Sequence, residues 1–191
     1  MNINKDLALY FIFFLIFISN ISFPQQINDE VKDILISTFG KNSTIKFAKY
    51  EIEKNAATKI EKQVKQKFFD SSVYYYQIIN NYKINGYALL DNVYGKSLPI
   101  TFLVLFDNAG NIISSQIVKY REQYGGSVKN PQWNEQFIGK NYSSSFEVGK
   151  EINSISGATI SVNSVTKGIQ KLTLLIKEII EKKKKKIISI G

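Results

Sequence analysis

The chain has 191 residues, a net charge of +9 at pH 7, and neither histidine nor cysteine. Without these two residue types it lacks iron–sulfur ligands, axial histidines for haem, the usual zinc sites, thiolate nucleophiles, and Ser-His or Cys-His triads. A redox function would therefore need an organic cofactor.

The N-terminus has the pattern of an export segment. Lys5 precedes an unbroken apolar run from Leu7 to Ile18, and small and polar residues return at 19–24. A helix of this length spans about 18 Å, less than the ~30 Å of a hydrocarbon core. We therefore predict that residues 1–23 are a signal peptide, with a retained N-terminal anchor as the alternative. The expected location is extracytoplasmic, periplasmic or on the outer face of a membrane.

Residues 24–68 are rich in charged and helix-forming residues. Apolar spacing predicts helices at 31–35 and 56–64, with a strand at 44–50 between them.

Strand signals dominate the next region, residues 69–181. Short β-branched and aromatic runs, separated by turn residues, predict strands at 73–79, 86–93, 99–106 and 112–120. The segment 107–111 between the last two has the composition of a hairpin loop. Together these features predict an α+β fold with a mainly antiparallel sheet.

The last long element of this region predicts an amphipathic helix. Apolar residues recur every three or four positions, at Val162, Val165, Ile169, Leu172, Ile176 and Ile179. Gly168 within the helix is unfavourable by about 1 kcal/mol relative to alanine. It therefore indicates close packing of the helix against the sheet or against a bound group.

A lysine-rich tail, residues 182–191, ends the chain, and Lys182 to Lys186 supply five of its positive charges. We expect this run to be the solvated end of the helix, where cations suit the helix dipole. The alternatives are attraction to anionic lipid headgroups at a membrane surface or to an acidic redox partner. Nucleic-acid binding is not expected, because the aromatic residues fall in strand patterns.

The segment Ser156–Ser161 stands where the C-terminal helix should begin. The first N–H groups of a helix have no intrahelical partner, and the helix dipole adds partial positive charge, so a phosphate on Thr159 would be stabilised there. Gly157 allows a sharp turn and close approach, while Ser156 and Ser161 suit capping and hydrogen bonding.

Four upstream segments extend this pattern: Asn85–Tyr87, Phe106–Ile112, Arg121–Gly126 and Trp133–Lys140. With the Ser156–Ser161 turn, they resemble the FMN-binding domain family, which includes the C subunit of sodium-translocating NADH:quinone reductases and the G subunit of Rnf electron-transport complexes. The resemblance covers about residues 84–175. The family usually has an acidic residue six positions before its threonine, where this chain has Asn153.

The resemblance implies an exported electron carrier with covalent FMN. A separate flavin transferase, using FAD and magnesium, would join FMN to Thr159 through a phosphoester. Electrons would pass to or from a membrane redox complex or another donor and acceptor. The cofactor-binding residues it implies besides Thr159 are Ser156, Gly157, Ala158, Ile160, Ser161, Glu122, Tyr124, Gly125, Gly126 and Trp133. No catalytic residue and no metal site are expected.

Covalent attachment by another enzyme agrees with the composition. Thr159 lacks the imidazole base that self-catalysed attack would ordinarily use. An exported protein also meets no FMN pool that could refill a reversible site by mass action.

Several alternatives remain at this point. Ser156–Ser161 is also compatible with an ordinary helix start, Trp133 with a core residue, and Glu122 with a structural carboxylate. The chain would then be a binding module of the same fold, holding FMN reversibly or acting without flavin as an extracytoplasmic accessory protein. A hydrolase with Thr159 as nucleophile is disfavoured because no base accompanies it.

Overall fold

A five-stranded antiparallel sheet in the order β1-β2-β3-β4-β5 organises the protein. The computed structural model describes residues 25–188, so the predicted export segment lies outside the described residues. In chain order the elements are α2 (Gln25–Phe39), β1 (Thr44–Glu51), α3 (Lys54–Val64), β2 (Ser72–Asn80), β3 (Lys83–Tyr94), β4 (Pro99–Asp107), β5 (Ile112–Lys119), the short 3-10 helix η2 (Gly126–Lys129), α4 (Pro131–Glu135) and α5 (Thr159–Ile188). The predicted α+β fold with a mainly antiparallel sheet is confirmed.

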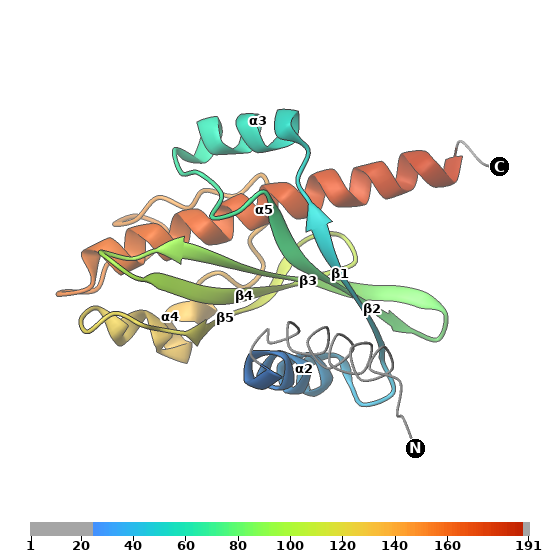
Figure 1. Cartoon of the computed structure of the whole chain (residues 1–191), viewed down its shortest axis with the longest axis horizontal. Coiled ribbons are helices and arrows are strands. Elements are labelled where there is room, and N and C mark those ends of the chain that lie inside the picture. Colours follow the sequence, from blue (N-terminus) through green and yellow to red (C-terminus); the bar gives the residue numbers. More distant parts are fainter. Residues whose placement is uncertain (1–24, 189–191) are drawn as a thin grey trace, which may run out of the picture.

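Helices cover both faces of the sheet (Figure 1). Successive side chains of a strand point to opposite faces, so the continuous apolar run of β4 supplies two cores. On one face Phe102, Val104 and Phe106 pack with residues of α3 and α5. On the other face Leu103 and Leu105 pack with residues of α2. The region before residue 69 therefore belongs to the same body, because it provides α2, α3 and the edge strand β1.

Gly168 lies where α5 crosses the sheet most closely. A Cβ added there would lie 2.7 Å from both Phe102 Cζ and Val93 Cγ1. The sequence predicted that this glycine packs either against the sheet or against a bound group, and in the structure it packs against the sheet. Glycine is tolerated in mid-helix because only a hydrogen fits between helix and strand.

Replacing Gly168 by alanine should destabilise the fold, although alanine favours a helix by about 1 kcal/mol. The methyl group would overlap two core side chains, and such overpacking typically costs about 1–3 kcal/mol. We expect a lower urea midpoint for Gly168→Ala, with little change for Gln170→Ala, a half-buried position on the same helix. A variant as stable as the wild type would show that the core side chains shift to make room for the methyl group.

The lysines near the end of α5 are not all solvated, so the expectation of a simple solvated helix end is wrong for part of the run. Lys182 forms an ion pair with Glu53 (Nζ to Oε1, 2.6 Å). Lys183 Nζ donates to the Tyr75 hydroxyl at 2.7 Å and to Gln77 Oε1 at 2.8 Å, and burial lowers its pKa. These contacts fix the end of α5 to the loop before α3 and to β2. Lys184 and Lys185 are exposed.

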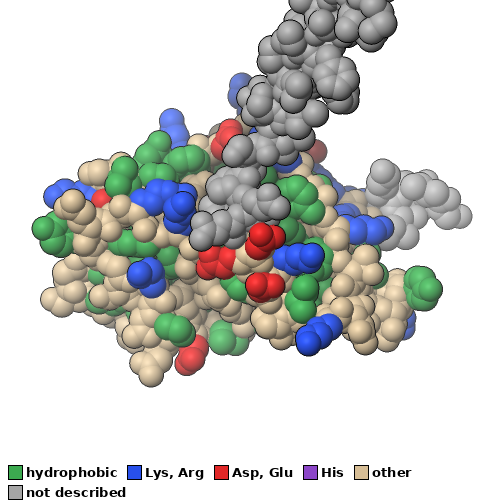
Figure 2. All heavy atoms as spheres, turned by 60° about the horizontal axis from the view of Figure 1, so that its bottom comes forward, with side chains coloured by type: hydrophobic (Ala, Val, Ile, Leu, Met, Phe, Trp, Pro, Cys, Tyr) green, Lys and Arg blue, Asp and Glu red, His purple; other side chains and the backbone are tan. Residues whose placement is uncertain are grey.

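Surface charge is mixed on the α2 side of the molecule. Figure 2 shows Lys and Arg side chains scattered among acidic ones on this face, without one continuous basic patch. Within residues 25–188, no helix combines the length and the apolar character needed to cross a bilayer.

Candidate functional site

Thr159 is the first residue of α5 and is exposed, while its neighbour Ala158 is buried. The Ala158 N–H donates to Ile155 O at 3.1 Å, and the Val162 N–H donates to Ala158 O at 2.9 Å. The N–H groups of the three residues between them belong to the first helical turn and have no intrahelical acceptor. The exposed hydroxyl of Thr159 therefore stands beside a set of free backbone donors at the positive end of a long helix.

Gly157 gives the chain its turn into the helix. Its φ of +76° lies in the left-handed region, which glycine adopts without strain. A Cβ added there would have no heavy atom within 4 Å, so the space beside this turn is open. Ser156 is exposed, whereas Ser161 is buried.

The segment that follows β5 packs directly against this turn. The Tyr120 hydroxyl bonds to Ser161 Oγ at 2.9 Å and donates to the Tyr124 carbonyl oxygen. Gly125 has a φ of +81°, and a Cβ there would lie 2.8 Å from Ser161 Oγ and 2.9 Å from the Tyr120 hydroxyl. Gly125 is thus required both by its backbone conformation and by the close contact. Ser161 bonds to a neighbouring segment and is not a helix cap.

Glu122 holds the turn between β3 and β4. Its Oε1 accepts the N–H groups of Ser97 at 2.5 Å and Leu98 at 2.9 Å. These backbone hydrogen bonds lower the pKa of Glu122, so the side chain is an ionised carboxylate at neutral pH. Gly95 lies against it, because a Cβ at Gly95 would be 2.7 Å from Glu122 Oε1. The structure thus favours the structural alternative for this carboxylate.

The turn before α5, the segment after β5 and the β3–β4 turn together line an open cavity of about 390 Å³. This volume falls in the range of about 300–1,000 Å³ that is common for small-molecule sites. The cavity is lined by Lys96, Glu122, Tyr124, Gly125, Gly157, Ala158, Thr159, Ile160 and Ser161. Figure 1 shows the start of α5 and the β3–β4 turn at the same end of the molecule.

Two residues of this arrangement have no signal in the sequence. Lys96 is an exposed lysine in a hairpin turn, and Tyr120 ends a segment that has an ordinary strand pattern. Their positions depend on tertiary contacts. Glu122 binds the turn that carries Lys96, and Ser161 bonds to Tyr120.

Three residues expected at the site do not line the cavity: Ser156, Gly126 and Trp133. Trp133 is buried, its Nε1 donates to Asn153 O at 2.8 Å, and its ring meets Phe137 edge-on at 5.2 Å. The structure therefore favours the core alternative for Trp133. Gly126 begins η2 beside the ring of Tyr120.

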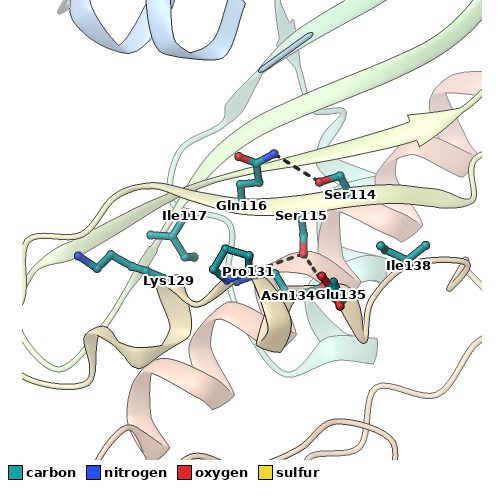
Figure 3. Close-up of a pocket in the computed structure, with 9 residues that line it drawn as sticks. All are labelled: Ser114, Ser115, Gln116, Ile117, Lys129, Pro131, Asn134, Glu135 and Ile138. Atoms are coloured by element: carbon teal, nitrogen blue, oxygen red, sulfur yellow. Dashed lines mark hydrogen bonds between the residues drawn. The ribbon is translucent and has the colours of Figure 1, made fainter. Parts of the chain in front are cut away.

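A second cavity, of about 410 Å³, lies between β5 and α4 (Figure 3). Ser115 on β5 points toward Asn134 on α4, with Oγ 3.2 Å from Asn134 Oδ1. The polar side chains at its centre thus serve the packing of α4 on the sheet. None of the residues expected from the sequence to bind a cofactor lines this cavity.

The second half of the chain is similar to a known family. Residues 95–173 match the family model of the FMN-binding domain. The matched range begins at the β3–β4 turn and ends within α5, so it contains every residue that lines the cavity beside Thr159. No curated protein matches the chain.

Proposed function

Because residues 95–173 belong to the FMN-binding domain family, we propose that this chain is an electron-transfer flavoprotein whose FMN is joined to Thr159 through a phosphoester. The observation that carries the proposal is the position of Thr159. Its exposed hydroxyl lines a cavity and stands at the first turn of α5, where free N–H groups favour a phosphate.

The residues around the cavity suit FMN in other respects. The open space beside Gly157 leaves room for a phosphate against the backbone. Tyr124 and Ile160 line the cavity and are 82% and 50% exposed, so they offer apolar surface for an isoalloxazine ring to cover. Bound FMN would supply the electron-transfer chemistry.

The residues that line the cavity support attachment by a separate flavin transferase. Deprotonation of the Thr159 hydroxyl requires a base. Of the two charged side chains that line the cavity, Glu122 accepts hydrogen bonds from the β3–β4 turn and Lys96 is a cation. We therefore assign the transfer chemistry to an FAD- and magnesium-dependent partner enzyme. A membrane redox complex or another donor and acceptor would exchange electrons with the product.

The proposal is tested with the wild-type protein co-expressed with a flavin transferase. We expect a fluorescent band after denaturing electrophoresis and an intact mass increased by one phosphoester-linked FMN. Flavin that is present in the native protein but lost on denaturation would favour reversible binding instead. A native protein without flavin would leave the accessory-module alternative.

We also propose that residues 1–23 direct the protein out of the cytoplasm, because the apolar run is too short for an ordinary membrane span. A fusion of residues 1–30 to a reporter active only outside the cytoplasm should be active. Deletion of residues 7–18 should retain the protein inside the cell. Export that persists after this deletion would refute the assignment.

A further inference from the structure

We propose that Lys96 raises the reduction potential of the flavin by placing a positive charge at the cavity beside Thr159. The inference rests on the proposed function, because it concerns the same FMN. Lys96 lies in the β3–β4 turn, far in sequence from Thr159, but both residues line the same cavity.

Lys96 is the cation among the residues that line the cavity. The other charged residue there is Glu122, whose carboxylate accepts hydrogen bonds from N–H groups of the β3–β4 turn and also interacts with the charge of Lys96. Within the described part of the chain, the Lys96 ammonium makes neither an ion pair nor a side-chain hydrogen bond. Its N–H groups can therefore donate to an anionic group in the cavity.

The backbone that carries Lys96 is held in place. Tyr94 pairs with Pro99 at the end of the hairpin, and the Gly95 N–H donates to Leu98 O at 3.0 Å. Glu122 accepts two further hydrogen bonds from the turn, donated by the N–H groups of Ser97 and Leu98. Because the turn is fixed at both ends, the lysine starts from a defined position at the cavity.

The chemistry of flavin reduction gives this cation a consequence. Two electrons and one proton, delivered by an external reductant, leave one negative charge on an isoalloxazine ring that was neutral when oxidised. A nearby ammonium lowers the free energy of the charged, reduced form more than that of the neutral, oxidised form. The equilibrium constant for reduction therefore rises, and the midpoint potential becomes less negative.

The test compares midpoint potentials of the covalently loaded full-length proteins, measured by dithionite titration with a reference dye at low ionic strength. For Lys96→Met we expect an approximately tenfold smaller equilibrium constant for reduction, which is about 30 mV for a two-electron couple. Lys96→Arg keeps the charge and should restore most of the potential. Lys62→Met removes one charge from an exposed position on α3 and should leave the potential unchanged. The difference should shrink at high salt, because the lysine is exposed.

Each result decides the inference. A lower potential for Lys96→Met but not for Lys62→Met, with most of the potential restored in Lys96→Arg, supports it. Equal potentials for Lys96→Met and wild type, both carrying FMN, overturn it and leave the proposed function intact. A Lys96→Met protein with reduced FMN attachment and an unchanged potential would place the lysine at the phosphate, which also overturns it. A wild-type protein without flavin would instead refute the proposed function, and this inference with it.

Discussion

Thr159→Val should carry no covalent FMN when it is co-expressed with a flavin transferase, while it folds as the wild type does. Valine has nearly the shape of threonine but lacks the oxygen that a phosphoester requires. Thr159 is exposed at the start of α5, and substitutions at such positions usually change stability by less than about 0.5 kcal/mol. The expected result is complete loss of the fluorescent band and of the added mass, with an unchanged thermal midpoint for the flavin-free protein.

Two variants bracket this result. Thr159→Ser keeps the oxygen and should retain part of the labelling. Thr44→Val makes the same chemical change at an exposed position on β1 and should leave labelling complete. A Thr159→Val protein that is still fluorescent after denaturation would place the linkage on another residue.

The strands were predictable because their signals are local. Alternating and continuous apolar runs between turn residues predicted 73–79, 99–106 and 112–120, close to the observed β2, β4 and β5. The start of β3 was not predicted. Asn81 and Tyr82 have positive φ values of 48° and 61°, and a tight turn with tyrosine in this region lacks the usual Asn-Gly signal.

The candidate site likewise has one part that the sequence predicted and another that it did not. The turn at 156–161 has a local signature, since a glycine and small polar residues precede an apolar-periodic helix. Lys96 belongs to the site because the carboxylate of Glu122 binds its turn across the end of the sheet. A contact of this kind depends on the folded arrangement of segments more than twenty residues apart, so no local pattern predicts it.

A buried ion pair under α5 is another feature that no local pattern indicated. Lys171 on α5 is fully buried and Asp91 on β3 is 5% exposed, with Nζ 3.8 Å from Oδ2. The Lys171 ammonium also donates to Lys67 O at 2.7 Å and lies 4.6 Å from the centre of the Phe68 ring. Asp91 Oδ2 has no hydrogen-bond partner within the described residues. Lys171 is thus the main compensation for this carboxylate.

Burial raises the pKa of Asp91 to about 6, although the charge of Lys171 opposes the shift. Burial likewise lowers the pKa of Lys171. An acid whose pKa is higher in the folded state than in the unfolded state binds its proton more tightly when folded. The stability that this proton contributes is therefore fully present below the unfolded value of 3.8 and is lost as the pH rises through about 6.

Lys171→Met should destabilise the protein by about 3–5 kcal/mol near neutral pH, because a buried carboxylate would lose its cation. Without Lys171 the pKa of Asp91 should rise further, so the loss should be larger at pH 8 than at pH 5, where Asp91 is protonated. Urea unfolding at both pH values measures this difference. The double variant Asp91→Leu with Lys171→Met replaces both charges by apolar groups and should recover most of the lost stability. A loss that is the same at pH 5 and pH 8, and is not relieved in the double variant, would mean that Lys171 stabilises α5 through packing rather than through charge.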